Sequence, residues 1–480
     1  MIKITIRKDW EKMNRTAVIN VVGLTGSLIG PAMPNMARFA SQGKTTRILP
    51  AFPAVTCAAQ SNYLTGHQPV HHGIVGNGWY DRALAEVHFW KQSNHLVAGP
   101  KIWEKMRQTD PKFTCAQLFW WFNMYSTADY SITPRPAYPA DGRKIFDIYC
   151  QPAHIRPAIK QALGEFPFPA FWGPAAGVTT PQGAADAASR WIAESAKWIE
   201  ARYSPTLNLI YLPHLDYNLQ RHGPLARSVL ADLAQIDAIV GDLISYFQSR
   251  GVRIILLSEY GITPVVQPVH LNRLFRQKGW IAVREELGLE LLDCGASRAF
   301  AVADHQVAHI YLNDPSLAGP VRALLQEQAG VESVLGDTEK TELGINHPRA
   351  GDLIAVAAES AWFTYYYWLD DALAPDFARC VDIHRKPGYD PVELFLDPQL
   401  PLVKLKILWR LARKQLGFRM LMDVVPLDAA LIGGSHGRRV TAPGEQPVFI
   451  CDRSAGALPD QIDSTAVAAL IQRQMQAERF

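Results

Sequence analysis

The sequence predicts an α/β protein with a central, mostly parallel sheet that is flanked by helices on both faces. Three continuous apolar runs support this prediction, at residues 17–24, 207–212 and 253–257. Strands of a parallel sheet are buried on both faces, so they show such runs rather than an alternation of polar and apolar residues. Turn residues and stretches of helical period separate the runs, which is the pattern of repeated strand–helix units.

The helices and the other strands of this core follow from the same reasoning. Residues 34–42 read as a short helix that starts with proline and ends before glycine. Residues 184–203 have helical periodicity, and a long helix follows with an apolar stripe from Leu225 to Phe247. Residues 45–49 are predicted as a second strand.

The pattern changes between residues 264 and 350, where short alternating runs predict an antiparallel α+β insertion. We therefore expect residues 14–263 and 351–480 to form the core, and 264–350 to form a smaller, cap-like subdomain. Residues 1–13 are expected to be an N-terminal appendage. The apolar run at 352–357 is expected to return to the main sheet.

Composition limits the classes of function. The 48 basic residues are nearly balanced by 45 acidic ones, so the net charge of +3 gives no indication of nucleic-acid binding. Six dispersed cysteines form no Cys-x-x-Cys pair, which is typical of buried thiols in a reducing compartment. The N-terminal residues show no secretory signal, and no apolar run is long enough for a membrane span. The sequence thus predicts a cytoplasmic protein.

The stretch from Phe52 to Tyr80 is the first candidate site. Thr56 stands at the predicted start of a helix that ends at Gly66, and Asn77 follows on a glycine-rich loop. A hydroxyl at a helix N-terminus, close to an amide, can bind a phosphate group. The alternative is a helix N-cap followed by a surface turn.

Two acidic residues follow core strands, and both are expected at the same sheet edge. Asp216 comes after the run that ends at residue 212, and Glu259 after the run that ends at 257. Sites in such sheets form at the carboxyl ends of strands. The aromatic-rich stretch 113–150 is interpreted as core, or as a wall of an apolar substrate pocket.

The order of these motifs resembles the alkaline phosphatase superfamily, in its nucleotide pyrophosphatase/phosphodiesterase and phosphonoacetate-hydrolase-like branch. The motifs are Met33-Pro-Asn, Phe52-Pro-Ala-Val-Thr, Leu64-Thr-Gly, His72-Gly-Ile-Val-Gly-Asn, a strand followed by Asp216, Ser258-Glu-Tyr-Gly, and Ser435-His-Gly. The resemblance covers nearly the whole chain from about residue 14. It implies a hydrolase in which two zinc ions activate a hydroxyl nucleophile and hold the reacting oxygens.

The resemblance also assigns roles to individual residues. Thr56 matches the nucleophile, and Asn77 matches the amide that binds a phosphate oxygen. Asp216 and His436 match metal ligands, and Glu259 stands where a further metal-binding aspartate is usual.

Three other ligand positions of the family are changed. Val22 stands in place of an aspartate, and Gln220 and Tyr260 stand in place of histidines. Valine cannot bind a metal, and glutamine and tyrosine are unusual zinc ligands. These changes argue against a full two-zinc site. They leave at most one divalent metal, most simply zinc, on Asp216, His436 and Glu259.

Nearby residues offer replacements for the changed ligands. His222, His384 and His214 are the candidate replacement ligands, although a lone histidine is more often structural. Arg385 and Lys386 lie in an Asp-Ile-His-Arg-Lys-Pro-Gly-Tyr run and are candidate ligands for a substrate phosphate.

Two functions remain. The first is a metal-dependent phosphodiesterase or nucleotide-pyrophosphatase-like hydrolase of a small phosphorylated or aromatic substrate, which the retained Thr56 and Asn77 favour. The alternative is a pseudoenzyme that binds a metabolite or serves as a scaffold, which the lost ligands favour. The sequence leans towards the hydrolase.

A basic segment at residues 404–419 carries six Lys or Arg residues and no acid, with helical character. It is interpreted as a solvated helix face, or as a weak contact with an anionic surface.

Overall fold

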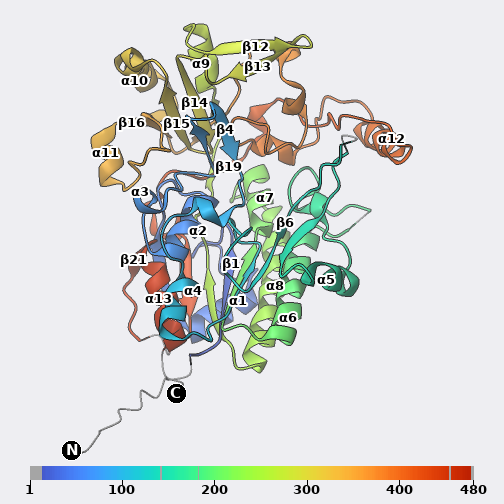
Figure 1. Ribbon diagram of the computed structural model, residues 1–480, viewed down its shortest axis with the longest axis vertical. Helices are drawn as coiled ribbons and strands as arrows, with labels where there is room; N and C mark the ends of the chain where they lie inside the picture. The colour runs from blue at the N-terminus through green and yellow to red at the C-terminus, as the bar shows by residue number, and fades with distance from the viewer. Residues whose placement is uncertain (1–12, 141–142, 182, 453–455, 477–480) are drawn as a thin grey trace, which may run out of the picture.

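A computed structural model describes residues 13–140, 143–181, 183–452 and 456–476. Its centre is a nine-stranded sheet in the order β21-β2-β20-β9-β1-β8-β5-β6-β7 (Figure 1). The strands are β1 (Thr16–Val21), β2 (Lys44–Leu49), β5 (Cys115–Leu118), β6 (Tyr130–Pro134), β7 (Ile148–Gln151), β8 (Leu207–Leu212), β9 (Arg253–Leu257), β20 (Val448–Cys451) and β21 (Gln461–Asp463).

The middle of this sheet is parallel, as predicted. β1 pairs in parallel with β8 on one side and with β9 on the other, and β8 pairs in parallel with β5. Every residue of β1, β8 and β9 is buried, which explains their continuous apolar runs. Antiparallel pairs in the described residues lie towards the edges of the sheet, where β20 pairs with both β9 and β2, and β7 pairs with β6.

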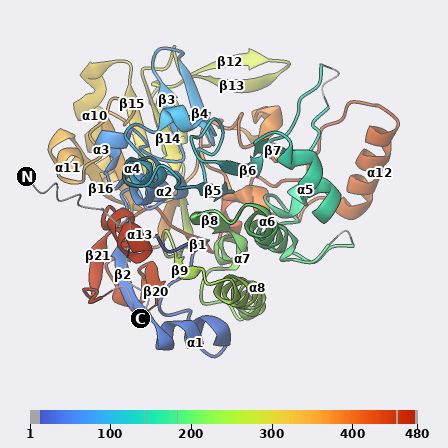
Figure 2. The same cartoon turned by 60° about the horizontal axis from the view of Figure 1, so that its bottom comes forward.

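Helices cover both faces of the sheet, which confirms the predicted fold class. In Figure 2, α2, α4 and α13 lie on one side, and α1, α6 and α8 on the other. Their bounds are α1 (Pro34–Gln42), α2 (Thr56–Thr65), α4 (Ile102–Thr109), α6 (Ala187–Tyr203), α8 (Val229–Ser249) and α13 (Ala466–Gln476). None of the helices in the described part of the chain is long and apolar enough to cross a membrane.

A smaller four-stranded sheet, in the order β14-β15-β17-β16, forms a second layer of structure above the main one (Figure 1). Its neighbouring strands are all antiparallel. The strands and accompanying elements are α9 (Leu271–Gln277), β12 (Ala282–Glu286), β13 (Leu289–Asp293), β14 (Ala299–Asp304), β15 (Val307–Leu312), α10 (Ala318–Glu327), β16 (Val331–Leu335), α11 (Asp337–Glu342) and β17 (Leu353–Ala357).

The expected return to the main sheet at residues 352–357 is wrong. This run is β17, which pairs with β15 and β16 in the smaller sheet. The next strand of the main sheet is β20, almost a hundred residues later in the chain. Since β17 is fully buried, its apolar run indicates a buried strand but does not identify the sheet to which it belongs. The other boundaries of the domain division stay a prediction.

The other α-helices and strands lie outside these two sheets. They are α3 (Pro69–His72), β3 (Gly78–Asp81), β4 (Glu86–Phe89), α5 (Ile155–Leu163), α7 (His214–His222), β10 (Thr263–Pro264), β11 (Gln267–Val269), β18 (Ala361–Phe363), α12 (Val403–Gln415) and β19 (Gly434–Ser435). β10 pairs with β19, so the segment after β9 runs beside the segment that carries His436. This pairing brings two distant parts of the sequence to the same edge of the main sheet.

Gly261 makes a close backbone contact directly after the segment Glu259-Tyr260. A Cβ at this position would lie 2.0 Å from the carbonyl oxygen of Glu445 and 2.8 Å from Cγ2 of Thr25. We expect Gly261→Ala to lower the free energy of unfolding by about 1–3 kcal/mol, the usual cost of overpacking. Equilibrium urea denaturation measures this change.

Gly26→Ala is the matched control, because its nearest neighbour would be Cγ1 of Val448 at an ordinary 3.9 Å. It should change the free energy of unfolding far less. Equal losses in both variants would contradict a specific clash at Gly261.

Candidate active site

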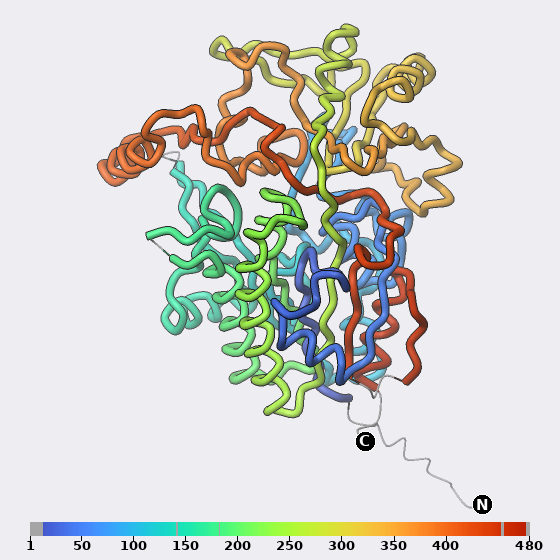
Figure 3. Tube along the Cα trace, turned by 180° about the vertical axis from the view of Figure 1, so that it is seen from behind, coloured from blue at the N-terminus to red at the C-terminus, as the bar shows by residue number. Residues whose placement is uncertain are grey.

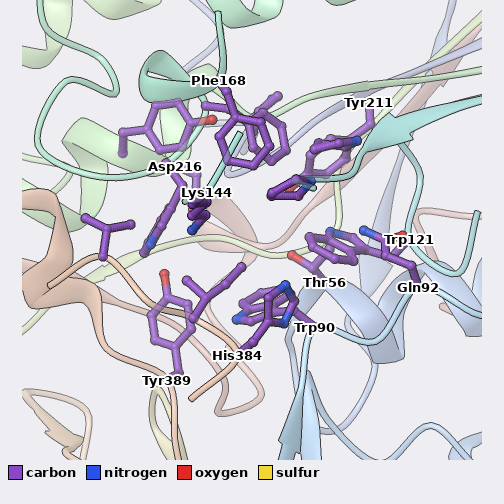
Figure 4. Close-up of a pocket in the computed structure, with 18 of the residues that line it drawn as sticks. Thr56, Trp90, Gln92, Trp121, Lys144, Phe168, Tyr211, Asp216, His384 and Tyr389 are labelled. Atoms are coloured by element: carbon purple, nitrogen blue, oxygen red, sulfur yellow. The ribbon is translucent and has the colours of Figure 1, made fainter. Parts of the chain in front are cut away.

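A pocket lies beyond the carboxyl ends of β8 and β9 (Figure 4). Thr56 and Asp216 line it, together with Lys144 and His384. Most of the remaining wall is aromatic and consists of Trp90, Trp121, Tyr138, Phe168, Phe171, Trp172, Tyr211, Tyr217, Tyr260 and Tyr389. Such a surface suits a planar or apolar ligand group.

The aromatic stretch 113–150 contributes both to the core and to this pocket. Phe119 and Trp120 are buried in the main core, whereas Trp121 and Tyr138 line the pocket. Both interpretations of this stretch therefore hold, for different residues.

Thr56 is the first residue of α2, and the residue before it, Val55, is the N-cap without a side-chain cap bond. Both Thr56 and Asn77 are buried. The alternative of an N-cap followed by a surface turn is therefore wrong. The predicted end of the helix is confirmed, because Gly66 adopts the left-handed conformation that closes it.

A chain of hydrogen bonds leads from the Thr56 hydroxyl into the site. Oγ1 of Thr56 lies 3.1 Å from the hydroxyl of Tyr260, and this hydroxyl donates to Oδ1 of Asp216 at 3.2 Å. Since the Tyr260 proton points to Asp216, Thr56 is the donor in the first of these bonds. The other oxygen of Asp216 accepts from Nε2 of Gln220 at 2.7 Å. Oε1 of Gln220 in turn accepts from the hydroxyl of Tyr389 at 3.1 Å.

Glu259 is buried beside this chain. Its Oε1 accepts from Nδ2 of Asn20 at 2.5 Å and from Nε2 of Gln60 at 2.6 Å. Burial outweighs these donors and raises the pKa of Glu259 to about 8. Burial likewise raises the pKa of Asp216 to about 7, against hydrogen bonds from Tyr260 and Gln220.

Asn77 is fixed by groups from two parts of the fold. Its Oδ1 accepts from the backbone N–H of Cys57 at 3.0 Å, at the start of α2. Its Nδ2 donates to Oδ1 of Asp304 at 3.0 Å, and its backbone N–H donates to Oδ2 at 2.8 Å. Burial raises the pKa of Asp304 to about 7. Asp304, at the end of β14, therefore holds the amide that the resemblance assigns to phosphate binding.

His436 lies in a stack of four rings. Its ring is 3.6 Å from that of Tyr260 and 3.6 Å from that of His305, which in turn is 3.7 Å from the ring of Tyr389. Nδ1 of His436 lies 2.7 Å from the carbonyl oxygen of Ala54, so this nitrogen carries the proton. Burial lowers the pKa of His436 to about 3, which keeps the imidazole neutral.

The residues present do not fit the two-zinc centre that the resemblance implies. Val22 is a fully buried apolar side chain, and both oxygens of Asp216 accept hydrogen bonds from Tyr260 and Gln220. Among the described residues, no group of three or more His, Cys, Asp or Glu side chains is arranged to hold a metal ion. The geometry thus gives no support to a single metal on Asp216, His436 and Glu259 either.

The three candidate replacement ligands are scattered. His214 is buried, with Nε2 at 3.2 Å from Oδ1 of Asp232. His222 is exposed at the end of α7 and does not line the pocket. His384 does line it, with Nδ1 at 3.3 Å from the carbonyl oxygen of Phe89. The fold therefore does not bring these histidines together.

The two candidate phosphate ligands have other partners. Nη2 of Arg385 lies 3.2 Å from Oδ1 of Asp376 at an exposed position. Lys386 is buried, and its Nζ lies 2.7 Å from Oδ2 of Asp390 and 2.8 Å from Oε1 of Glu393. Its charge is thus held inside the fold, which argues against Lys386 as a substrate ligand.

Lys386 instead helps to position a side chain of the pocket wall through an ion pair with Glu393. Glu393, which it fixes, accepts a hydrogen bond at 2.6 Å from Nε1 of Trp172, one of the lining residues. Within the described residues, Lys144 is the one lysine or arginine that lines the pocket. Sequence reasoning missed Lys144 because it lies in the aromatic stretch and in no motif of the resemblance.

Comparisons with known proteins agree on the fold. The family model "Type I phosphodiesterase / nucleotide pyrophosphatase" matches residues 16–390. Ectonucleotide pyrophosphatase/phosphodiesterase 1 of Saccharomyces cerevisiae is 23% identical over 281 residues. That match covers 53% of this chain and 34% of the yeast protein, so the chain matches about a third of the length of this relative.

Two solved structures are similar along almost the full length. Phosphonoacetate hydrolase from Sinorhizobium meliloti, in complex with phosphonoformate, is 14% identical with a TM-score of 0.60. An inactive variant of murine ectonucleotide pyrophosphatase/phosphodiesterase 5, in complex with AMP, is 13% identical with a TM-score of 0.58. Each comparison covers 97% of this chain and 96% of the other, and at this identity it shows the shared fold.

The buried carboxyl groups predict an unusual dependence of stability on pH. The pKa of Glu259 is about 8 in the folded protein, well above the usual 4.5 of a glutamate. The folded state therefore retains a proton that the unfolded state loses, so stability falls as pH rises from about 4.5 to about 8. We expect Glu259→Gln, which carries no ionisable group, to weaken this fall, and to be more stable than wild type at pH 8.5.

Melting temperatures of both proteins, measured from pH 5 to pH 8.5, provide the test. Glu332→Gln is the control, since Glu332 is a half-exposed acid paired with Arg438 on the surface. Identical pH profiles for Glu259→Gln and wild type would contradict the raised pKa of Glu259.

Proposed function

The chain belongs to the type I phosphodiesterase/nucleotide pyrophosphatase family, and we propose that it is a phosphoester hydrolase with Thr56 as the nucleophile. Family and fold support a phosphoester hydrolase in general terms. The hydrogen-bonded chain from Thr56 through Tyr260 to Asp216 carries the finer proposal. It connects a hydroxyl at the pocket to a carboxyl group with a pKa near neutrality.

The hydrogen bonds from Thr56 through Tyr260 connect the hydroxyl to Asp216, which serves as the base that a hydroxyl nucleophile requires. As Oγ1 of Thr56 attacks phosphorus, its proton passes to the Tyr260 oxygen, and the Tyr260 proton passes to Asp216. The bond from phosphorus to the leaving oxygen breaks, this oxygen departs with the bonding electrons and is protonated by solvent, and a phosphothreonine remains. Water then attacks phosphorus, and Thr56 regains its proton along the same path while water gives its proton to solvent.

The charge of the phosphoryl group is met by this chain's own donors. Nδ2 of Asn77 has a second N–H besides the one bound to Asp304, and it can donate to a phosphoryl oxygen. Lys144 adds a positive charge at the pocket. The first turn of α2 favours an anion through its backbone N–H groups. The lining rings suit a planar aromatic group on the ester, such as a nucleobase or an aryl group.

Divalent metals are general in this family, and a metal there neutralises phosphoryl charge. Because the donor set does not fit a two-zinc centre, the steps above use only groups of this chain. The effect of EDTA on turnover tests the predicted metal dependence.

A second candidate is a binding protein without catalysis. Two observations favour it: the N–H of Cys57 is already bound to Asn77, and both oxygens of Asp216 accept bonds from neutral side chains. A site held in this way can bind a planar phosphorylated metabolite without activating a nucleophile.

Turnover of bis-p-nitrophenyl phosphate distinguishes the two functions. We expect wild type to hydrolyse it at a rate that EDTA does not change, and Thr56→Ala to lose about 100-fold or more in kcat/KM, since the nucleophile is lost. Thr65→Ala, at the other end of the same helix, is the control and should retain the wild-type rate.

The outcomes are distinct. Equal rates for Thr56→Ala and wild type would remove Thr56 as the nucleophile. A wild-type rate restored only by added zinc would support metal dependence. Absence of turnover combined with binding of AMP, followed by tryptophan fluorescence, would support the binding protein, since Trp90, Trp121 and Trp172 line the pocket.

The relay also predicts a pH profile. Asp216 accepts a proton only when ionised, so the wild-type rate should rise through a pKa of about 7. Asp216→Asn should reduce kcat by about 100-fold and remove this rise. A variant that keeps both the rate and the profile of wild type would show that Asp216 is not the base.

A further inference from the structure

Helix α12 (Val403–Gln415) differs from ordinary surface helices, because none of its residues is buried. It stands at the periphery of the molecule, away from both sheets (Figures 1 and 3). A surface helix normally buries an apolar stripe against the core. α12 therefore gains little from apolar burial against its own protein.

The apolar face of α12 points outward. Leu405, Leu408 and Trp409 are 59%, 64% and 61% exposed, and their spacing places them on one side of the helix. Leu402 and Leu416 extend the same side. Of the twenty exposed large apolar side chains among the described residues, eight lie here: Leu402, Leu405, Leu408, Trp409, Leu411, Leu416, Phe418 and Leu421.

On the other side of α12, beside the half-buried Val403 and Ile407, three cations contact the protein. Nζ of Lys406 lies 3.0 Å from Oδ2 of Asp423, and Nη2 of Arg410 lies 3.0 Å from Oδ1 of the same residue. Nζ of Lys414 donates to the carbonyl oxygen of Lys144 at 3.4 Å. These three cations of the amphipathic helix thus contact the protein, whereas its apolar side chains face the solvent. A large exposed apolar surface of this kind marks an interaction site for an external partner.

Charge identifies the class of partner. Between Lys404 and Arg419 there are six Lys or Arg residues and no acid. Three of these cations contact the protein, whereas Lys404 and Arg413 lie by helical spacing on the two sides of the apolar face. An exposed apolar face with leucine and tryptophan, bordered by cations, is typical of helices that lie in the interface of an anionic membrane. We propose that α12 is a peripheral anchor that inserts its apolar face into an anionic lipid bilayer.

A neighbouring loop extends the same surface. Tyr138, Ile145 and Phe146 are also exposed, and Nζ of Lys414 lies 5.7 Å from the centre of the Phe146 ring. Lys144 and Tyr138 in this loop line the pocket. Docking through α12 would therefore place one wall of the pocket beside the lipid surface. This inference does not depend on whether Thr56 is a nucleophile.

Flotation of the 480-residue chain with vesicles tests the anchor. We expect the wild type to float with vesicles of phosphatidylcholine mixed with phosphatidylglycerol, less with phosphatidylcholine alone, and less at high salt, which screens the cations. The double variant Leu408→Glu, Trp409→Glu should bind the anionic vesicles at least about tenfold more weakly. Leu230→Glu on α8 is the matched control, since Leu230 is 55% exposed on another helix.

Circular dichroism and the elution volume of each variant accompany the binding data. Binding that the α12 variant retains, that Leu230→Glu loses equally, or that is absent in the wild type would overturn the proposal. So would a wild-type dimer that the α12 variant converts to monomer without any vesicle binding, because a second copy of the chain would then cover this face.

Discussion

The burial of three carboxyl groups, Asp216, Glu259 and Asp304, is the constraint on which the site depends. A carboxylate removed from water loses solvation that only a metal, an ion pair or hydrogen bonds can replace. Here hydrogen bonds from neutral side chains take this place, and burial raises each pKa to about 7 or 8. Each of these donors connects its own segment to a buried acid. Gln60 of α2 donates to Glu259, Gln220 of α7 donates to Asp216, and Asn77 donates to Asp304 at the end of β14.

Three positions that the family resemblance assigns to metal ligands carry other side chains in this chain. Tyr260 and Gln220 stand where the family resemblance expects histidines, and both now donate to Asp216. Val22 stands where an aspartate is expected, so one negative charge is absent from the edge of the sheet. Tyr260 and Gln220 thus supply hydrogen-bond donors to a buried acid that would be costly to leave without them. The Tyr260 hydroxyl connects the acid to the proposed nucleophile, since it donates to Asp216 and accepts from Thr56.

Much of the site followed from sequence, because the order of motifs around Thr56 and Asn77 is local. The positions of Asp216 and Glu259 followed from the apolar strands before them, whose carboxyl ends share one edge. Asp304, Lys144 and the true role of Lys386 did not follow. Asp304 reaches Asn77 across 227 residues of sequence, and Lys386 looks the same in sequence whether it binds a phosphate or two buried acids.

By itself, the sequence determined which segments are buried strands, which are helices, and where Thr56 begins one. These properties depend on local periodicity and on helix-ending residues such as Gly66. Only the tertiary structure decided that β17 belongs to the smaller sheet, that the apolar face of α12 points outward, and that Asp304 holds Asn77. Periodicity records whether a residue is buried, but the partner of a strand, a helix face or a carboxylate is chosen by contacts between segments far apart in the chain.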